Sequence, residues 1–170
     1  GAEFDLKYGR WLRSLVFEYI YTKYQSGPYN HDRTENISDH IAGMDDYYNH
    51  SIYTGWQHWG QVIGNPLYRS PIYNTDNSID VRNNRFYALH LGVEGSPTER
   101  LDYRVLTTYQ KGWGTYNNPF TKAYKNLSFL VEAKYKFNHN WTVRGGYAMD
   151  FGSEKMYGHN AGFQLTVTKS

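Results

Sequence analysis

Histidine and aspartate side chains gather in one polar stretch of the chain, between Lys23 and Asn84. Both residue types bind metal ions, but the stretch holds no HExxH pattern and no close pair of ligands on an expected helix. The chain has no cysteine, so a thiolate metal site is excluded. Polar loops often collect such residues, and we therefore expect no metal and no other cofactor. The residues concerned are His31, His40, His50, His58, Asp32, Asp39, Asp45 and Asp46.

Paired carboxylates are the second arrangement that could do chemistry. Hydrolysis of a glycosidic bond needs two carboxylates about 5–10 Å apart across the sugar. Asp45 with Asp46, or Glu18 with Glu132, could be imagined as such a pair, yet no neighbouring motif marks either one. The chain also has no glycine-rich phosphate loop and no nucleophile elbow. We therefore expect a protein that is not an enzyme.

Aromatic and amide groups are concentrated in "QKGWGTYNNPF", Gln110 to Phe120, directly after the regular alternation of "LDYRVLTTY". The segment is either a turn that packs on itself or a surface that meets a ligand. Flat aromatic rings suit the C–H-rich faces of sugars, and amides suit sugar hydroxyls. The alternatives are an interfacial aromatic girdle, or loops that fold inward and plug a lumen. Such groups come from Trp56, Trp59, Trp113, Tyr116, Asn117 and Asn118.

The elements that would position these groups are expected to be strands. The chain has 18 Tyr, 8 Phe and 5 Trp among 170 residues. Strands favour aromatic residues, and membrane β-barrels favour Tyr and Trp in particular. A mean hydropathy of −0.77 is compatible with a barrel, because only alternate strand residues face lipid. No apolar run reaches the ~18–20 residues of a membrane-spanning helix.

Period-2 alternation is clear in four successive segments and weaker in two earlier ones. In residues 127–137, for example, Leu127, Phe129 and Val131 alternate with polar residues such as Glu132 and Lys134. A further short strand is expected at residues 2–7. The clear segments are 101–109, 127–137, 141–151 and 161–167, and the weaker ones are 14–22 and 86–94.

Short and long connections alternate along the chain. The short ones are expected at residues 8–10, 95–99 and 138–140, and the long ones at 23–84, 111–126 and 152–160. Outer-membrane barrels have this asymmetry, whereas a soluble sandwich scatters its loop lengths over both ends. The fold class we predict is all-β, an antiparallel up-and-down outer-membrane β-barrel segment with about seven strands of a larger barrel.

The less apolar face of these strands mixes charged residues with Gly, Ala, Ser and Thr. Such a face suits a barrel lumen crossed by charged pairs. A hairpin register would place His90 near Arg104, and Ser128 near Asp150. The alternative is a one-sided antiparallel sheet whose polar face meets bulk water. The polar residues assigned to the lumen are Glu18, His90, Arg104, Glu132, Lys134, Arg144 and Asp150.

Several strings in this chain resemble the Wzi-like capsule assembly proteins, in the form common in Bacteroidetes. They follow one order over nearly the whole sequence: "SLVFEYIYTKYQSGPYNHDRT" (14–34), "DDYYNH" (45–50), "GWQHWGQVIGNPLY" (55–68), "NNR" (83–85), "LGVEGSP" (91–97), "YQKGWGTYNNPF" (109–120) and "NAGFQLTVTK" (160–169).

The resemblance implies a large outer-membrane barrel, of the class with ~16–18 strands. It implies a lectin-like, non-enzymatic role in the assembly or surface attachment of capsular polysaccharide. The partners would be capsular or surface polysaccharide, outer-membrane lipid, and an N-terminal part of the same barrel. The formal net charge of +2 gives no reason to expect nucleic acid. Under the resemblance, the polysaccharide-binding residues are Tyr47, Tyr48, Trp56, Trp59, Trp113, Tyr116, Asn117 and Asn118.

The expected organisation is therefore a single region, residues 1–170, forming the C-terminal portion of a transmembrane β-barrel. Residues 23–84 would be a long loop region, either extracellular or folded into the lumen. Two other functions stay open: an outer-membrane pore or transport component, and a soluble secreted carbohydrate-binding β-sheet domain.

Overall fold

The chain is nearly all β. A computed structural model describes residues 1–6, 9–24, 30–31, 40–42, 48–49, 55–137 and 140–169. Within that part, one short 3-10 helix, η1 (Pro71–Tyr73), interrupts an otherwise β architecture. The prediction of an all-β, antiparallel chain is confirmed.

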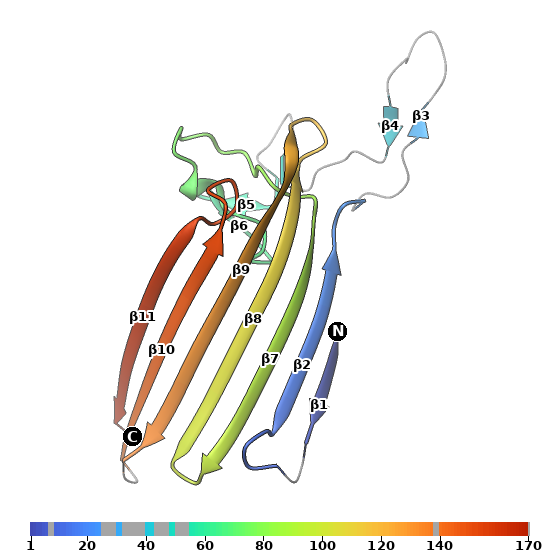
Figure 1. Cartoon of the computed structure of the whole chain (residues 1–170). Coiled ribbons are helices and arrows are strands. Elements are labelled where there is room, and N and C mark those ends of the chain that lie inside the picture. Colours follow the sequence, from blue (N-terminus) through green and yellow to red (C-terminus); the bar gives the residue numbers. More distant parts are fainter. Residues whose placement is uncertain are drawn as a thin grey trace. The chain divides into compact units, whose positions relative to one another are not determined.

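Seven strands form one antiparallel sheet in the order β1-β2-β7-β8-β9-β10-β11 (Figure 1). Each strand pairs with the next one of this sheet along the chain, which is the up-and-down arrangement. The sheet ends at β1 on one side and at β11 on the other. The strands are β1 (Ala2–Asp5), β2 (Ser14–Tyr21), β7 (Phe86–Thr98), β8 (Leu101–Gly114), β9 (Pro119–Lys136), β10 (Trp141–Gly152) and β11 (His159–Lys169).

Four short strands lie in the stretch that was expected to be a long loop. β3 (Asn30–His31) pairs with β4 (His40–Ala42), and β5 (Gln57–His58) pairs with β6 (Gln61–Val62). The chain divides into two compact units. The first comprises Gly1–Ile20, Ala88–Gln110 and Lys125–Ser170, and the second comprises Tyr21–Tyr87 and Lys111–Tyr124.

In the first unit, the register of β10 with both neighbours runs without a break. Tyr147 pairs with Val131 of β9 and with Phe163 of β11, so these three side chains form one row across the sheet. Because successive side chains point to opposite faces, the adjacent row contains Glu132, Gly146 and Gln164. The alternation expected from the sequence therefore gives one apolar face and one polar face.

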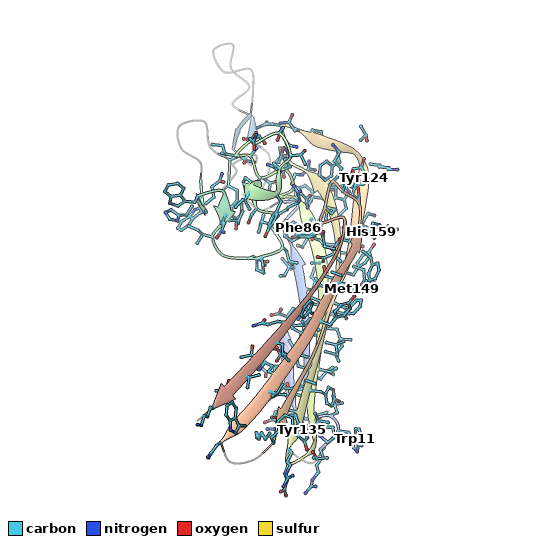
Figure 2. All side chains as sticks on the ribbon, turned by 90° about the vertical axis from the view of Figure 1, so that its left-hand side faces the viewer. Trp11, Phe86, Tyr124, Tyr135, Met149 and His159 are labelled. Carbon is cyan, nitrogen blue, oxygen red and sulfur yellow. The ribbon has the colours of Figure 1, made fainter. Side chains whose placement is uncertain are left out.

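The apolar face is exposed along the sheet of the first unit. Phe163 is 86% exposed, Leu165 67% and Val167 56%. Figure 2 views the sheet from the side, with Tyr135 and Met149 among the side chains of this face. Soluble monomers rarely expose a contiguous apolar patch of such extent. Other exposed members are Phe4, Phe17, Tyr19, Leu89, Leu91, Leu127, Val131, Tyr135, Trp141, Tyr147 and Phe151.

The second unit has a small buried core of its own. Phe86 is fully buried and packs edge-on against Tyr68 at 4.9 Å, and Tyr68 in turn packs against Tyr48 at 4.2 Å. The Thr22 hydroxyl accepts a 2.9 Å bond from the Phe86 amide and donates a 2.7 Å bond to the Asn84 carbonyl. This hydroxyl fixes the chain at the point where β2 ends.

The expected loop over residues 111–126 is much shorter in the structure. β8 continues to Gly114 because the Trp113 amide still bonds to the Arg85 carbonyl at 2.8 Å. The glycines make this extension possible. A Cβ on Gly112 would lie 2.4 Å from Asn83 Oδ1, and Gly114 has a φ of +79° that leads into the turn. Only residues 115–118 connect β8 to β9.

Candidate functional site

The second unit contains every described residue that the sequence suggested for polysaccharide binding. The structure divides them among three places. Tyr48 lies in the buried core, and Trp113 lies near the end of β8. Trp56 precedes β5, and Trp59 lies in the turn between β5 and β6. Tyr116, Asn117 and Asn118 form the turn that follows. Tyr47 is outside the described residues.

The first surface is a tryptophan hairpin, defined here as Trp56 to Ile63. Its two-residue turn, Trp59 and Gly60, has φ values of +51° and +72°, which is the type I′ combination. A bulky residue with positive φ is uncommon, and it requires support from its surroundings. The turn presents the Trp59 side chain to solvent, where it is 87% exposed, and Trp56 is 58% exposed.

Hydrogen bonds hold this hairpin in place from both sides. Gln57 donates its side-chain amide to the Ile79 carbonyl at 2.8 Å, and the Ile72 amide bonds to the Gly60 carbonyl at 2.9 Å. The Ile63 amide closes the base of the hairpin on the Trp56 carbonyl at 2.9 Å. The Trp59 ring is therefore exposed on a supported turn.

A shallow depression of about 350 Å³ lies beside Trp59, lined also by Gln57, His58 and Ile79. The His58 ring stands edge-on to the indole at 6.1 Å. An exposed indole with an amide and an imidazole beside it can stack on a sugar ring and bond to its hydroxyls. The hairpin is thus the most accessible of the candidate sugar-binding surfaces among the described residues.

The second surface is a basic aromatic cluster, defined here as Lys23, Arg85, Lys111, Trp113 and Tyr116. The ammonium groups of Lys23 and Lys111 lie 5.1 and 5.6 Å from the centre of the Trp113 ring. The Arg85 guanidinium lies 4.4 Å from the centre of the Tyr116 ring. The Tyr116 hydroxyl donates a 2.8 Å bond to the Lys23 carbonyl, so two distant segments of sequence are joined here.

Burial raises the pKa of Tyr116 above its ordinary value of 10.0, while the nearby Arg85 acts in the opposite direction. The phenol therefore stays protonated and able to donate to the Lys23 carbonyl at physiological pH. Asn117 and Asn118 are exposed at the tip of the turn, where the Thr115 hydroxyl accepts a 2.9 Å bond from the Asn118 amide. The hydrogen bonds of Tyr116 and Asn118 fix the conformation of the turn.

The polar face of the first unit carries a third arrangement, a network of ion pairs. Glu132 lies 3.5 Å from Arg104 and 3.8 Å from Arg144, and Asp102 lies 4.0 Å from Lys134 and 3.8 Å from Lys136. Lys134 and Arg144 are direct cross-strand partners. Like charges at such positions repel, and the carboxylates of Glu132 beside Arg144 and of Asp102 beside Lys134 offset this repulsion. The network borders a depression of about 360 Å³.

Two neighbour relations were predicted for the polar face. Ser128 and Asp150 are cross-strand partners, with the serine hydroxyl 2.5 Å from the carboxylate, so that prediction is confirmed. His90 is not beside Arg104 as predicted: it bonds to the Thr108 hydroxyl at 2.7 Å, four residues farther along β8 than Arg104. Glu18 is exposed on β2.

The described residues contain no group of three or more His, Asp or Glu side chains placed to hold a metal ion. In the same part of the chain, no helix has the length and apolarity needed to cross a membrane. Comparison with protein-family models, curated proteins and solved structures finds no match to this chain.

Proposed function

We propose that this chain is part of a bacterial outer-membrane β-barrel that holds capsular or other surface polysaccharide at the cell surface. The observation that carries the proposal is the sheet with two chemically opposite faces. One face exposes Phe163, Leu165 and Val167, and the other carries the paired charges of Glu132 and Arg144.

The two faces suit lipid and an aqueous interior. In a barrel, lipid would cover the exposed apolar side chains, and the polar face would line the lumen. Additional strands would then pair with the outer edges of β1 and β11, because an open sheet edge is not stable within hydrocarbon. Such strands would come from the remainder of the same protein, as the resemblance to Wzi-like proteins implies.

The tryptophan hairpin supports the polysaccharide part of the proposal. Trp59 and Trp56 are exposed, the backbone beneath them is hydrogen-bonded, and polar groups lie beside the ring. Stacking of a sugar on an exposed indole needs no catalytic group. The proposed role is therefore retention of the polymer, with no reaction step.

The test uses the full-length protein in cells that make the polysaccharide. Membrane fractionation and heat-modifiable gel mobility first check the barrel, which should be recovered in the outer membrane and shift on heating. The double variant Trp56→Ala/Trp59→Ala should then release polymer into the medium. Trp11→Ala is the matched control, because Trp11 is also exposed, at 74%, and lies in the first unit. Equal polymer retention by both variants would contradict the proposed binding surface.

A further inference from the structure

The basic aromatic cluster differs from the tryptophan hairpin in how its indole is used. Trp113 is half-buried, and the two ammonium groups of Lys23 and Lys111 approach its ring. Tyr87 adds a second ring at 5.8 Å. A ring in these surroundings is less available for stacking on a sugar than the exposed Trp59. Its position favours a role in placing cations.

The cations of this cluster have no acidic partner within the part of the chain that the structure describes. Among the described residues, no carboxylate forms an ion pair with Lys23, Arg85 or Lys111. The Arg85 Nε is also buried without a hydrogen-bond partner in that part of the chain. On the polar face of the first unit, by contrast, Arg104, Lys134, Lys136 and Arg144 all lie near Asp102 or Glu132. Three positive charges that lie against aromatic rings, with no carboxylate paired to them among the described residues, are complementary to an anion.

The aromatic neighbours indicate where that anion would be. Tyr21 and Tyr24 are exposed, at 45% and 59%, with ring centres 6.1 Å apart. Tyrosine and tryptophan rings beside Lys and Arg are the side chains that proteins place at the boundary between hydrocarbon and lipid headgroups.

We propose that the basic aromatic cluster binds the phosphate groups of an anionic lipid headgroup in the outer leaflet. This inference rests on the proposed membrane location and goes beyond polysaccharide retention. Lys23 and Lys111 would contact the phosphate oxygens, and the rings of Trp113, Tyr87 and Tyr24 would lie at the level of the headgroup. Arg85, whose Nη1 donates a 3.1 Å hydrogen bond to the Thr115 carbonyl, would add a fixed charge at the edge of the site.

The experiment titrates the purified full-length protein, in micelles of a neutral detergent, with diphosphoryl lipid A and with the same lipid after dephosphorylation. The variant Lys23→Gln/Lys111→Gln removes the two ammonium groups. The matched control, Lys122→Gln/Lys155→Gln, removes two exposed lysines outside the cluster. Lys122 is a stringent choice because it also lies over an aromatic ring, 5.8 Å from the centre of Tyr124.

Each lysine near a membrane surface contributes about 1 kcal/mol toward an anionic lipid. Loss of two should therefore weaken binding of diphosphoryl lipid A about 30-fold, or about 2 kcal/mol, with little change in the control. The dephosphorylated lipid should bind weakly and equally to all three proteins. Heat-modifiable mobility checks that each variant is folded.

Equal affinity of the cluster and control variants for diphosphoryl lipid A would overturn the proposal. So would a loss that is just as large for the dephosphorylated lipid. A third arm uses polygalacturonate, a soluble acidic polysaccharide. If binding of that polymer, and not binding of lipid A, depended on Lys23 and Lys111, the ligand of this site would be an acidic glycan and not a lipid. Outer-membrane recovery and polymer retention are scored separately, so failure of the proposed function and failure of this site give different results.

Discussion

Substitution of Leu165 by arginine tests whether the apolar face of the sheet meets lipid or water. Leu165 lies near the middle of β11, pairs with Gly145, and is 67% exposed. Its neighbour Gln164 points to the opposite face and is also exposed. Leu165→Arg and Gln164→Arg thus place the same side chain on the two faces of one strand.

The two environments predict different free energies of unfolding. Complete burial of a leucine side chain is worth about 1.5–3 kcal/mol, so lipid covering its exposed two-thirds would supply about 1–2 kcal/mol. An arginine near the bilayer midplane of a barrel costs a further 2–4 kcal/mol, roughly. Leu165→Arg should therefore destabilise a membrane barrel by about 3–6 kcal/mol. Gln164→Arg should change the free energy of unfolding by no more than about 0.5 kcal/mol.

The assay is denaturant unfolding of the full-length protein in lipid vesicles, followed by heat-modifiable mobility and extrapolated linearly to zero denaturant. Tryptophan fluorescence provides a second probe and checks two-state behaviour. If the free energies of unfolding of Leu165→Arg and Gln164→Arg agreed within about 0.5 kcal/mol, the apolar face would not lie in hydrocarbon and the proposed membrane location would be wrong.

Three other predictions concern local structure. Thr22→Val leaves the buried Phe86 amide without its acceptor and should cost about 1–3 kcal/mol in the free energy of unfolding, measured by denaturant titration. Gly112→Ala should lower the free energy of unfolding by about 1–3 kcal/mol, because the added Cβ clashes with the buried Asn83. Gly145→Ala is the control: apart from its chain neighbours, no atom lies within 4 Å of the added Cβ, so this change should be tolerated in the same assay. The hydrogen bond that Arg82 donates lowers the pKa of Asp76 below its ordinary value of 3.8. This carboxylate therefore stabilises its loop at pH values above the unfolded pKa, and the contribution is lost as the pH falls through the folded pKa. A carboxyl carbon NMR titration in which Asp76 behaved as an unperturbed aspartate would contradict that last expectation.

Period-2 alternation predicted the strands well wherever one face is consistently apolar. Leu127 to Phe137 was identified as a strand, and β9 contains nearly all of it. The same strand begins eight residues earlier, at Pro119, because it continues to pair beyond the alternating region. In that extension, lysines such as Lys122 and Lys125 interrupt the hydrophobic pattern. Backbone pairing there depends on the neighbouring strand, which a local pattern does not describe.

The sequence predicted which residue types form the candidate sites, but not which of these residues lie close together. Trp59 was selected for its ring, yet its exposure results from a two-residue turn that places a tryptophan where asparagine is more usual. The sequence predicts a loop at Trp113, but this residue belongs to β8 and its ring lies beside Lys23, which is 90 positions earlier. That proximity follows from how β2, β7 and β8 are ordered in the sheet. Sequence spacing alone gives no signal of it.

The pairing of β10 and β11 has a consequence for amide hydrogen exchange. β10 has a hydrogen-bonded partner on each side, so its amides should be protected at every position, whichever neighbour they face. β11 pairs only with β10 among the described strands, so protection along it should alternate, with every second amide exchanging rapidly. Any strand that joins the outer edge of β11 would remove this alternation. Exchange rates along eleven residues would then report whether the edge is occupied, independently of the chemical nature of the partner.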